Sequence, residues 1–145
     1  MAVNIPEVAE VLGGRNALKR EIQSLEDMRQ AVERGLPVRS LHLAINRITS
    51  SKKEATELTY DIVPRTTLHR RRTRLSKKES EQLERLARMT ALAEEVWEDL
   101  ALAHEFLTSS QPQLGGKKPV ELVDSDLGTR QVEDLLYRLE YSLPA

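Results

Sequence analysis

Residues 51–74 read SKKEATELTYDIVPRTTLHRRRTR, a stretch that predicts two short helices joined by a tight connection. Ser51 and Glu54 fit a capping box, in which the serine hydroxyl and the glutamate carboxylate each accept a backbone N–H that the first helical turn leaves unpaired. Pro64 suits the first position of the second helix, because that position has no use for a backbone N–H. The stretch therefore predicts a helix-turn-helix.

The second of these helices is basic and has one apolar anchor, Leu68, so most of its surface should be exposed. A slim polar helix can enter the major groove of DNA, where side chains read base edges while Arg and Lys neutralise phosphates. The candidate base-reading residues, at the start of the helix, are Arg65, Thr66, Thr67 and His69. The candidate phosphate contacts are Arg70, Arg71, Arg72 and Arg74, and the DNA-binding set also includes Lys52 and Lys53.

The distribution of charge supports this interpretation. The whole chain is nearly neutral, with 22 Lys plus Arg, 23 Asp plus Glu and a net charge of −1. Residues 34–78, however, hold 12 basic and 3 acidic residues, a net charge of +9, which leaves −10 for the remainder. A basic segment between acidic ends is typical of a chain in which one part meets a polyanion. The alternative is a solvated basic helix with no role in binding, and the turn also lacks the glycine common in such motifs.

The rest of the chain is predicted to be helical, because apolar residues recur at three- and four-residue steps and no stretch alternates as a strand would. The predicted helices outside the helix-turn-helix are residues 5–12, 16–34, 38–48, 76–107 and 132–139. Gly35 should end the second of them, since glycine tolerates the left-handed backbone of a helix C-terminus. The helix over residues 76–107 could be continuous or kinked near Glu94.

The fold class is therefore all-α, and 145 residues can form one domain or two small ones. We expect a helical DNA-binding domain over residues 1–93, with the helix-turn-helix near residues 51–74. A small helical C-terminal domain should occupy residues 94–145.

Composition excludes several function classes. The absence of cysteine excludes disulfides and zinc sites that need thiolate ligands. No apolar stretch is long enough to span a membrane and the first ten residues lack a signal-peptide pattern, so we expect a cytoplasmic protein with no membrane partner. Nucleophile elbows, phosphate-binding loops, dinucleotide fingerprints and paired-histidine motifs are absent. We therefore expect no enzyme activity, no metal, no cofactor and no small-molecule substrate.

Three isolated histidines and a glycine–lysine segment are the remaining candidates for chemistry. His104 lies on the apolar stripe of its helix, where a hydrogen-bonded structural histidine is expected rather than a metal ligand. Residues 115–118 read GGKK, which could suggest a phosphate cradle, but that motif needs more widely spaced glycines and a preceding strand.

The C-terminal third contains most of the aromatic residues, which are Trp97, Phe106, Tyr137 and Tyr141, and the tail over residues 141–145 is apolar. Two interpretations stay open. The aromatics could form a small core of their own, or they could form a surface that a partner covers.

Two sets of residues resemble a known family. The first set is Leu114, Gly115, Gly116, Lys117, Lys118, Pro119, Leu122, Val123, Asp124, Gly128, Val132, Leu135, Leu136, Arg138, Leu139, Glu140, Tyr141 and Ala145. It resembles the toxin-binding domain of the Xre/MbcA/ParS antitoxins, although Ser142 stands where the family usually has Gly and Phe106 where it has Trp. The second set resembles the Xre-like helix-turn-helix of the same family and comprises residues 64–71, Leu75, Ser76, Ser80, Leu83, Arg85, Leu86 and Ala87.

The resemblance implies an antitoxin of a bacterial type II toxin-antitoxin system with no enzymatic activity of its own. Its partner would be a RES-domain toxin that acts on NAD, and the C-terminal domain would cover the toxin's active cleft. The toxin-binding residues that the resemblance implies are Leu114, Gly115, Gly116, Lys117, Lys118, Pro119, Arg138, Tyr141, Leu143, Pro144 and Ala145.

The family resemblance also implies a repressor that binds its own promoter DNA, as a homodimer or as the toxin complex, and so associates with the nucleoid. The competing hypothesis is a dimeric helix-turn-helix transcription regulator with no toxin partner, whose C-terminal domain serves assembly alone.

Overall fold

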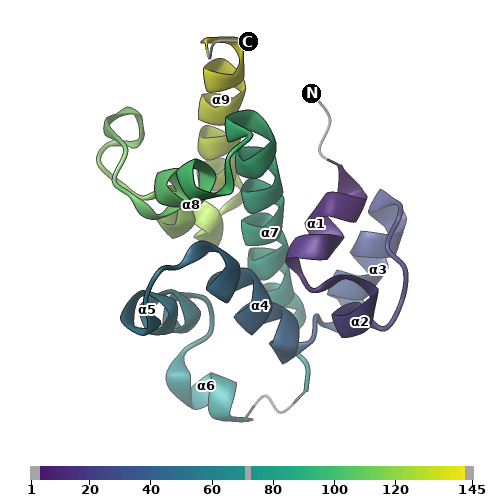
Figure 1. Ribbon diagram of the computed structural model, residues 1–145. Helices are drawn as coiled ribbons and strands as arrows, with labels where there is room; N and C mark the ends of the chain where they lie inside the picture. Colours follow the sequence, from purple (N-terminus) through teal and green to yellow (C-terminus); the bar gives the residue numbers. More distant parts are fainter. Residues whose placement is uncertain (1–3, 71–72, 143–145) are drawn as a thin grey trace.

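The computed structural model describes residues 4–70 and 73–142, and within these ranges the regular elements are helices, joined by turns and loops (Figure 1). Its α-helices are α1 (Ile5–Val11), α2 (Gly14–Leu18), α3 (Leu25–Arg34), α4 (Val38–Ile48), α5 (Lys52–Ile62), α6 (Arg65–Arg70), α7 (Lys77–Trp97), α8 (Leu100–Thr108) and α9 (Asp126–Ser142). Two short 3-10 helices, η1 (Pro112–Leu114) and η2 (Pro119–Asp124), connect α8 to α9. The prediction of an all-α fold is confirmed.

The long helix α7 is the centre of the fold. Figure 1 shows α1 and α3 on one side of it and α8 and α9 on the other, while α4 and α5 also pack against it and α6 lies below α4 and α5. Leu83, Leu86, Met89 and Leu92 of α7 are fully buried, because their spacing places them on faces that meet both groups of helices. One continuous apolar core therefore runs from α1 to α9. The boundary predicted between residues 93 and 94 falls within α7, and the division into domains stays a prediction.

The predicted helix over residues 16–34 is wrong in its first half. The short helix α2 ends at Lys19, whose φ of 60° is left-handed, and α3 starts again after Ser24. Ser24 and Asp27 form a capping box, with the Asp27 backbone N–H donating to Ser24 Oγ at 3.0 Å and the Ser24 N–H donating to Asp27 Oδ2 at 3.2 Å. The intervening turn buries Ile22, which gives the turn an apolar anchor.

The predicted helix over residues 76–107 is two helices, and the break lies after the position expected for a kink. Glu98 takes the left-handed conformation with φ of 53° and ends α7. Asp99 then caps α8 by accepting the Leu102 N–H at 3.0 Å. Because of this break, the apolar face of α7 does not continue along α8 as predicted, and Leu100 is 57% exposed instead of buried.

Gly35 ends α3 as predicted, with φ of 96°. A Cβ at this position would clash with the backbone carbonyl of Leu75, so the site excludes larger residues as well as favouring glycine. The clash marks a close crossing of two chain segments. Leu75 N–H donates to Leu36 O at 2.8 Å, and the Leu36 N–H donates to the buried Ser80 Oγ at 2.7 Å. The segment that follows α6 is thereby attached to the α3–α4 junction.

Candidate functional site

The predicted helix-turn-helix is formed by α5 and α6, which are joined by Val63 and Pro64. Ser51 caps α5 as expected, since its Oγ accepts the Glu54 N–H at 3.1 Å. The pair is anchored through α5, where Leu58, Ile62 and the connecting Val63 are buried. A hydrophobic connection takes the place of the turn glycine that the sequence lacks.

The helix α6 is held at the surface and buries none of its residues. Leu68 and Thr67 are half-buried, whereas Arg65, Thr66, His69 and Arg70 are exposed. The Arg65 guanidinium lies over the Tyr60 ring at 5.2 Å from its centroid, a cation–π contact that ties the start of α6 to α5. The outer face of α6 is therefore free to enter a groove of matching shape.

Four of the candidate DNA-binding cations have no acidic partner among the described residues. The ion pairs within the described part of the chain are made by other basic side chains. None of them includes Lys52, Lys53, Arg65 or Arg70. These four cations on α5 and α6 thus keep their positive charge unpaired, although α5 also carries Glu54, Glu57 and Asp61. Arg71 and Arg72, also predicted to bind DNA, lie outside the described residues.

Arg74 has a local use within the fold. Its Nη1 donates to Gly35 O at 2.9 Å, and its backbone forms an isolated antiparallel bridge with Pro37. Arg74 therefore fastens the end of the basic segment to α3 and α4. Its place among the DNA contacts stays a prediction.

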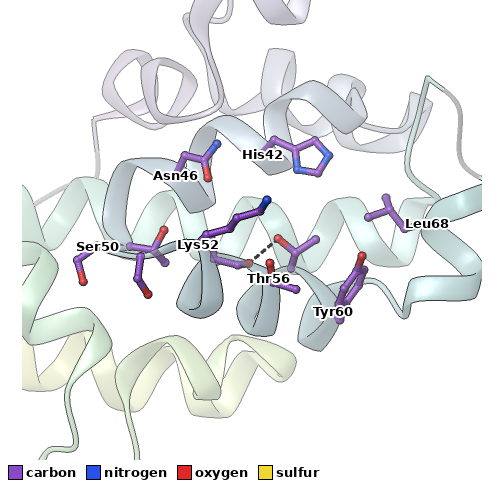
Figure 2. Close-up of a pocket in the computed structure, with 11 residues that line it drawn as sticks. His42, Asn46, Ser50, Lys52, Thr56, Tyr60 and Leu68 are labelled. Atoms are coloured by element: carbon purple, nitrogen blue, oxygen red, sulfur yellow. Dashed lines mark hydrogen bonds between the residues drawn. The ribbon is translucent and has the colours of Figure 1, made fainter.

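A polar groove runs between α4 and α5, and we call it the α4–α5 groove. It has a volume of about 440 Å3. Its lining residues are His42, Asn46, Thr49, Ser50, Ser51, Lys52, Ala55, Thr56, Thr59, Tyr60 and Leu68. Figure 2 shows Lys52 extending from α5 toward the side of the groove that carries His42 and Asn46. The sequence indicated Lys52 but gave no signal for the two α4 residues.

We call the described part of the predicted toxin-binding set, residues 114–119, Arg138 and Tyr141, the C-terminal surface. It begins with the loop around Gly115 and Gly116. Both glycines are left-handed, with φ of 67° and 81°, and a Cβ at either would meet no atom within 4 Å. Gln111 closes the loop, because its backbone N–H donates to Lys117 O at 3.0 Å and its carbonyl accepts the Gly116 N–H at 2.9 Å. The loop therefore projects from the body of the protein with a defined shape.

The other predicted toxin-binding residues lie in mixed environments. Lys117, Lys118 and Arg138 are exposed, Leu114 is half-buried, and Pro119 is buried at the start of η2. Tyr141, near the end of α9, is 83% exposed. Leu143, Pro144 and Ala145 lie outside the described residues.

The C-terminal aromatics do not all share one environment, and the interpretation that a partner covers some of them stays a prediction. Phe106 is buried and Trp97 half-buried, and their ring centroids lie 6.0 Å apart, so these two contribute to the core. Tyr141 does not join them and remains available to a partner.

A charged cluster that the sequence did not indicate joins the two surfaces. Arg47 of α4 binds Glu94 of α7 through both carboxylate oxygens, at 2.8 and 2.7 Å. His104 Nε2 of α8 lies 2.7 Å from Glu94 Oε2, so the expectation that His104 is a hydrogen-bonded structural histidine is confirmed. Burial alone would raise the pKa of Glu94, but the hydrogen bonds from Arg47 and His104 outweigh burial and hold the pKa below its ordinary value.

These observations define a class of protein, an all-helical chain with an exposed basic helix-turn-helix and a separate C-terminal surface. The chain matches two domains of one known family. Residues 27–88 match the antitoxin Xre-like helix-turn-helix domain, and residues 92–141 match the antitoxin Xre/MbcA/ParS C-terminal toxin-binding domain. The chain belongs to the Xre/MbcA/ParS-type antitoxins.

One curated relative is the antitoxin Xre of Pseudomonas putida strain KT2440, which is 33% identical over 81 residues. The aligned part is 54% of this chain and 51% of the relative, so the chain spans about half the length of the curated protein it matches. Among the described residues, no helix combines the length and apolar character that a membrane span requires.

Proposed function

We propose that this protein is a type II antitoxin that neutralises a RES-domain toxin and represses its own promoter. The C-terminal surface would cover the active cleft of the toxin and so protect cellular NAD. The helices α5 and α6 would bind promoter DNA, with the protein acting as a homodimer in the bacterial cytoplasm and nucleoid. The chain itself would catalyse no reaction.

The observation that carries the DNA-binding half of this proposal is the combination of exposure and unpaired charge on α5 and α6. The helix α6 buries no residue, and Lys52, Lys53, Arg65 and Arg70 have no acidic partner in the described part of the chain. A structural helix of six residues would normally bury an apolar face, since a short helix has little stability of its own. Exposure of this helix is better explained by a partner that α6 enters.

The toxin-binding half is supported by the features that the C-terminal surface leaves uncovered. The Gly115–Gly116 loop has open space where a Cβ of either residue would lie, and Tyr141 exposes a large ring at the end of α9. Exposed aromatic side chains of this kind commonly anchor protein–protein interfaces.

The test is coexpression of the chain with the RES-domain toxin encoded beside it, with cell growth and cellular NAD as readouts. Truncation after Leu139 removes the last turn of α9 with Tyr141 and should release toxicity, while DNA binding should persist because α5 and α6 are intact. A matched variant, Tyr141→Ala, should weaken protection without shortening the helix.

Full protection by the truncated chain would show that the end of α9 does not cover the toxin. If no neighbouring reading frame encodes such a toxin and nothing copurifies with the chain, the competing function applies, a dimeric transcription regulator with no toxin partner. Loss of DNA binding together with loss of protection would indicate an unfolded variant, and Tyr141→Ala then decides the question.

A further inference from the structure

The α4–α5 groove is a surface site whose chemistry is not explained by the packing of the helices around it. Its lining carries an ammonium group, an imidazole, a side-chain amide and several hydroxyls, and it contains no Asp or Glu. A larger groove between α3 and α7 provides the contrast. Its charged lining residues carry both signs and comprise Glu26, Arg29, Glu33, Lys77, Glu81, Glu84, Arg85, Arg88 and Asp126.

The groups in the α4–α5 groove divide into those used by the fold and those left free. Thr49 and Thr59 each donate to the carbonyl four residues earlier, at 2.8 and 2.7 Å, so their hydroxyls serve the helices. His42, Asn46, Lys52 and Thr56 are exposed, and their side chains make no hydrogen bond or ion pair to another described residue. The Glu54 carboxylate, at the start of α5, accepts the Ser50 backbone N–H at 3.4 Å.

The position of the groove relative to α6 indicates what could occupy it. Leu68 of α6 forms one end of the groove, and Tyr60, which supports the Arg65 guanidinium, lies beside it (Figure 2). A duplex that receives the outer face of α6 in its major groove would therefore carry one strand past α5 and α4. In helix-turn-helix complexes the helix that precedes the recognition helix crosses the DNA backbone in this way.

We infer that the α4–α5 groove binds the sugar–phosphate backbone of the DNA strand beside α6, and that His42 and Asn46 of α4 are phosphate-positioning residues together with Lys52 and Thr56. Backbone contacts of this kind fix the register of a protein on the duplex and carry no sequence information. The inference rests on the proposed DNA-binding function and extends the contact surface beyond the helix-turn-helix to α4.

The experiment measures binding of the full chain to two duplexes of equal length, one from the promoter of its own gene and one of random sequence, over a series of salt concentrations. The test variants are His42→Ala, Asn46→Ala and the double variant, with Asn16→Ala as the matched control because Asn16 is an exposed asparagine on α2. Each groove variant should weaken binding to both duplexes by the same factor, roughly 2- to 10-fold for one hydrogen bond lost at a solvent-exposed site. Asn16→Ala should leave binding unchanged.

Lys52→Ala supplies an independent readout. Loss of one phosphate-neutralising cation should reduce the slope of log affinity against log salt by about one unit, whereas Asn46→Ala should lower affinity without changing the slope. Because the altered side chains are exposed, the thermal unfolding of all variants should match that of the unaltered chain.

The outcomes separate this inference from the function on which it rests. If the unaltered chain binds neither duplex, the proposed DNA-binding function and the inference both fail. If Arg70→Ala weakens binding but the His42 and Asn46 variants do not, DNA binding stands and the groove is not part of the interface. If the groove variants change the preference between the two duplexes, the groove reads bases and the assignment to the backbone is wrong.

Discussion

Arg47 and Glu94 are 47 residues apart in the sequence and form a two-pronged ion pair, in which the guanidinium Nε and Nη2 donate to the two carboxylate oxygens. The pair connects α4, which precedes the helix-turn-helix, to the last turn of α7. His104 extends the connection to α8 through the same carboxylate. The two surfaces of the protein are therefore joined by charge as well as by the shared apolar core.

We expect Glu94→Gln to destabilise the protein by about 1 kcal/mol at neutral pH, a modest cost because the Arg47 side chain is 38% exposed. The folded state holds the Glu94 pKa below its ordinary value of 4.5, so the stabilisation is present above that pH and is lost as the carboxylate is protonated. Urea unfolding at neutral and acid pH should show the two proteins converging below about pH 4.5. A difference that persists at low pH would contradict the ionic origin of the effect.

Glu84 should show the opposite behaviour. Burial raises the pKa of Glu84, and Arg88, at 3.8 Å and shared with Glu133, only partly offsets this cost. The charged form is therefore disfavoured in the folded state, and stability falls as pH rises through the raised pKa. Glu84→Gln should stabilise the protein at neutral pH by up to about 1 kcal/mol, or roughly 2 to 4 °C in Tm.

Thermal unfolding measured against pH checks the Glu84 prediction. The gain should disappear in acid, where the unaltered residue is already neutral. Glu105→Gln, at an exposed position on α8, is the matched control and should leave Tm unchanged. A lower Tm for Glu84→Gln at neutral pH would show that its pairing with Arg88 outweighs its burial.

The exposed face of α6 allows base reading and phosphate contact to be told apart. Thr66→Ala should relax sequence preference, since a good base contact contributes about 1 to 3 kcal/mol of discrimination. Arg70→Ala should weaken binding to all duplexes alike and reduce the salt slope by about one unit. Affinities for promoter and random duplexes measure both effects. Equal losses on both duplexes for Thr66→Ala would remove that residue from the base-reading set.

The continuous core predicts that the protein unfolds as a unit. Leu41 of α4 is fully buried in this core, and Leu41→Ala should cost about 2 to 5 kcal/mol. The fluorescence of Trp97, the one tryptophan in the chain, reports on the far end of α7. We expect this fluorescence and far-UV circular dichroism to shift together in Leu41→Ala. A Trp97 transition that stays in place would indicate two independently folding domains.

The features that the sequence predicted correctly depend on short-range chemistry. Ser51 as the cap of α5 and Gly35 after α3 are local signals, and the structure confirms both, whereas the Glu54 carboxylate accepts the Ser50 N–H, at 3.4 Å, and does not complete the predicted capping box. In two stretches, two helices continue each other's apolar spacing across a break. That spacing wrongly predicted one helix over residues 16–34, and it left open whether residues 76–107 form one helix or two. The signals for the breaks, the Ser24–Asp27 capping box and Asp99 as an N-cap, were present in the sequence.

The missed parts of the candidate site have a different cause. The contact between Arg47 and Glu94 depends on how α4 packs on α7, and no local pattern encodes it. His42 and Asn46 belong to a helix outside the helix-turn-helix, and neither adds to a charge cluster. Their importance is visible only once α4 lies beside α5.

The central position of α7 has a consequence for turnover of the protein in the cell. This one helix packs against α4 and α5, which border the proposed DNA-binding surface, and against α8, η2 and α9 on the C-terminal side. If a protease unravels the helices at either end of the chain, the apolar face of α7 that they covered becomes exposed. The helices at the other end then lose the packing that holds them in place. If the proposed function holds, repression and toxin neutralisation would then lapse together, without an interval in which one survives the other.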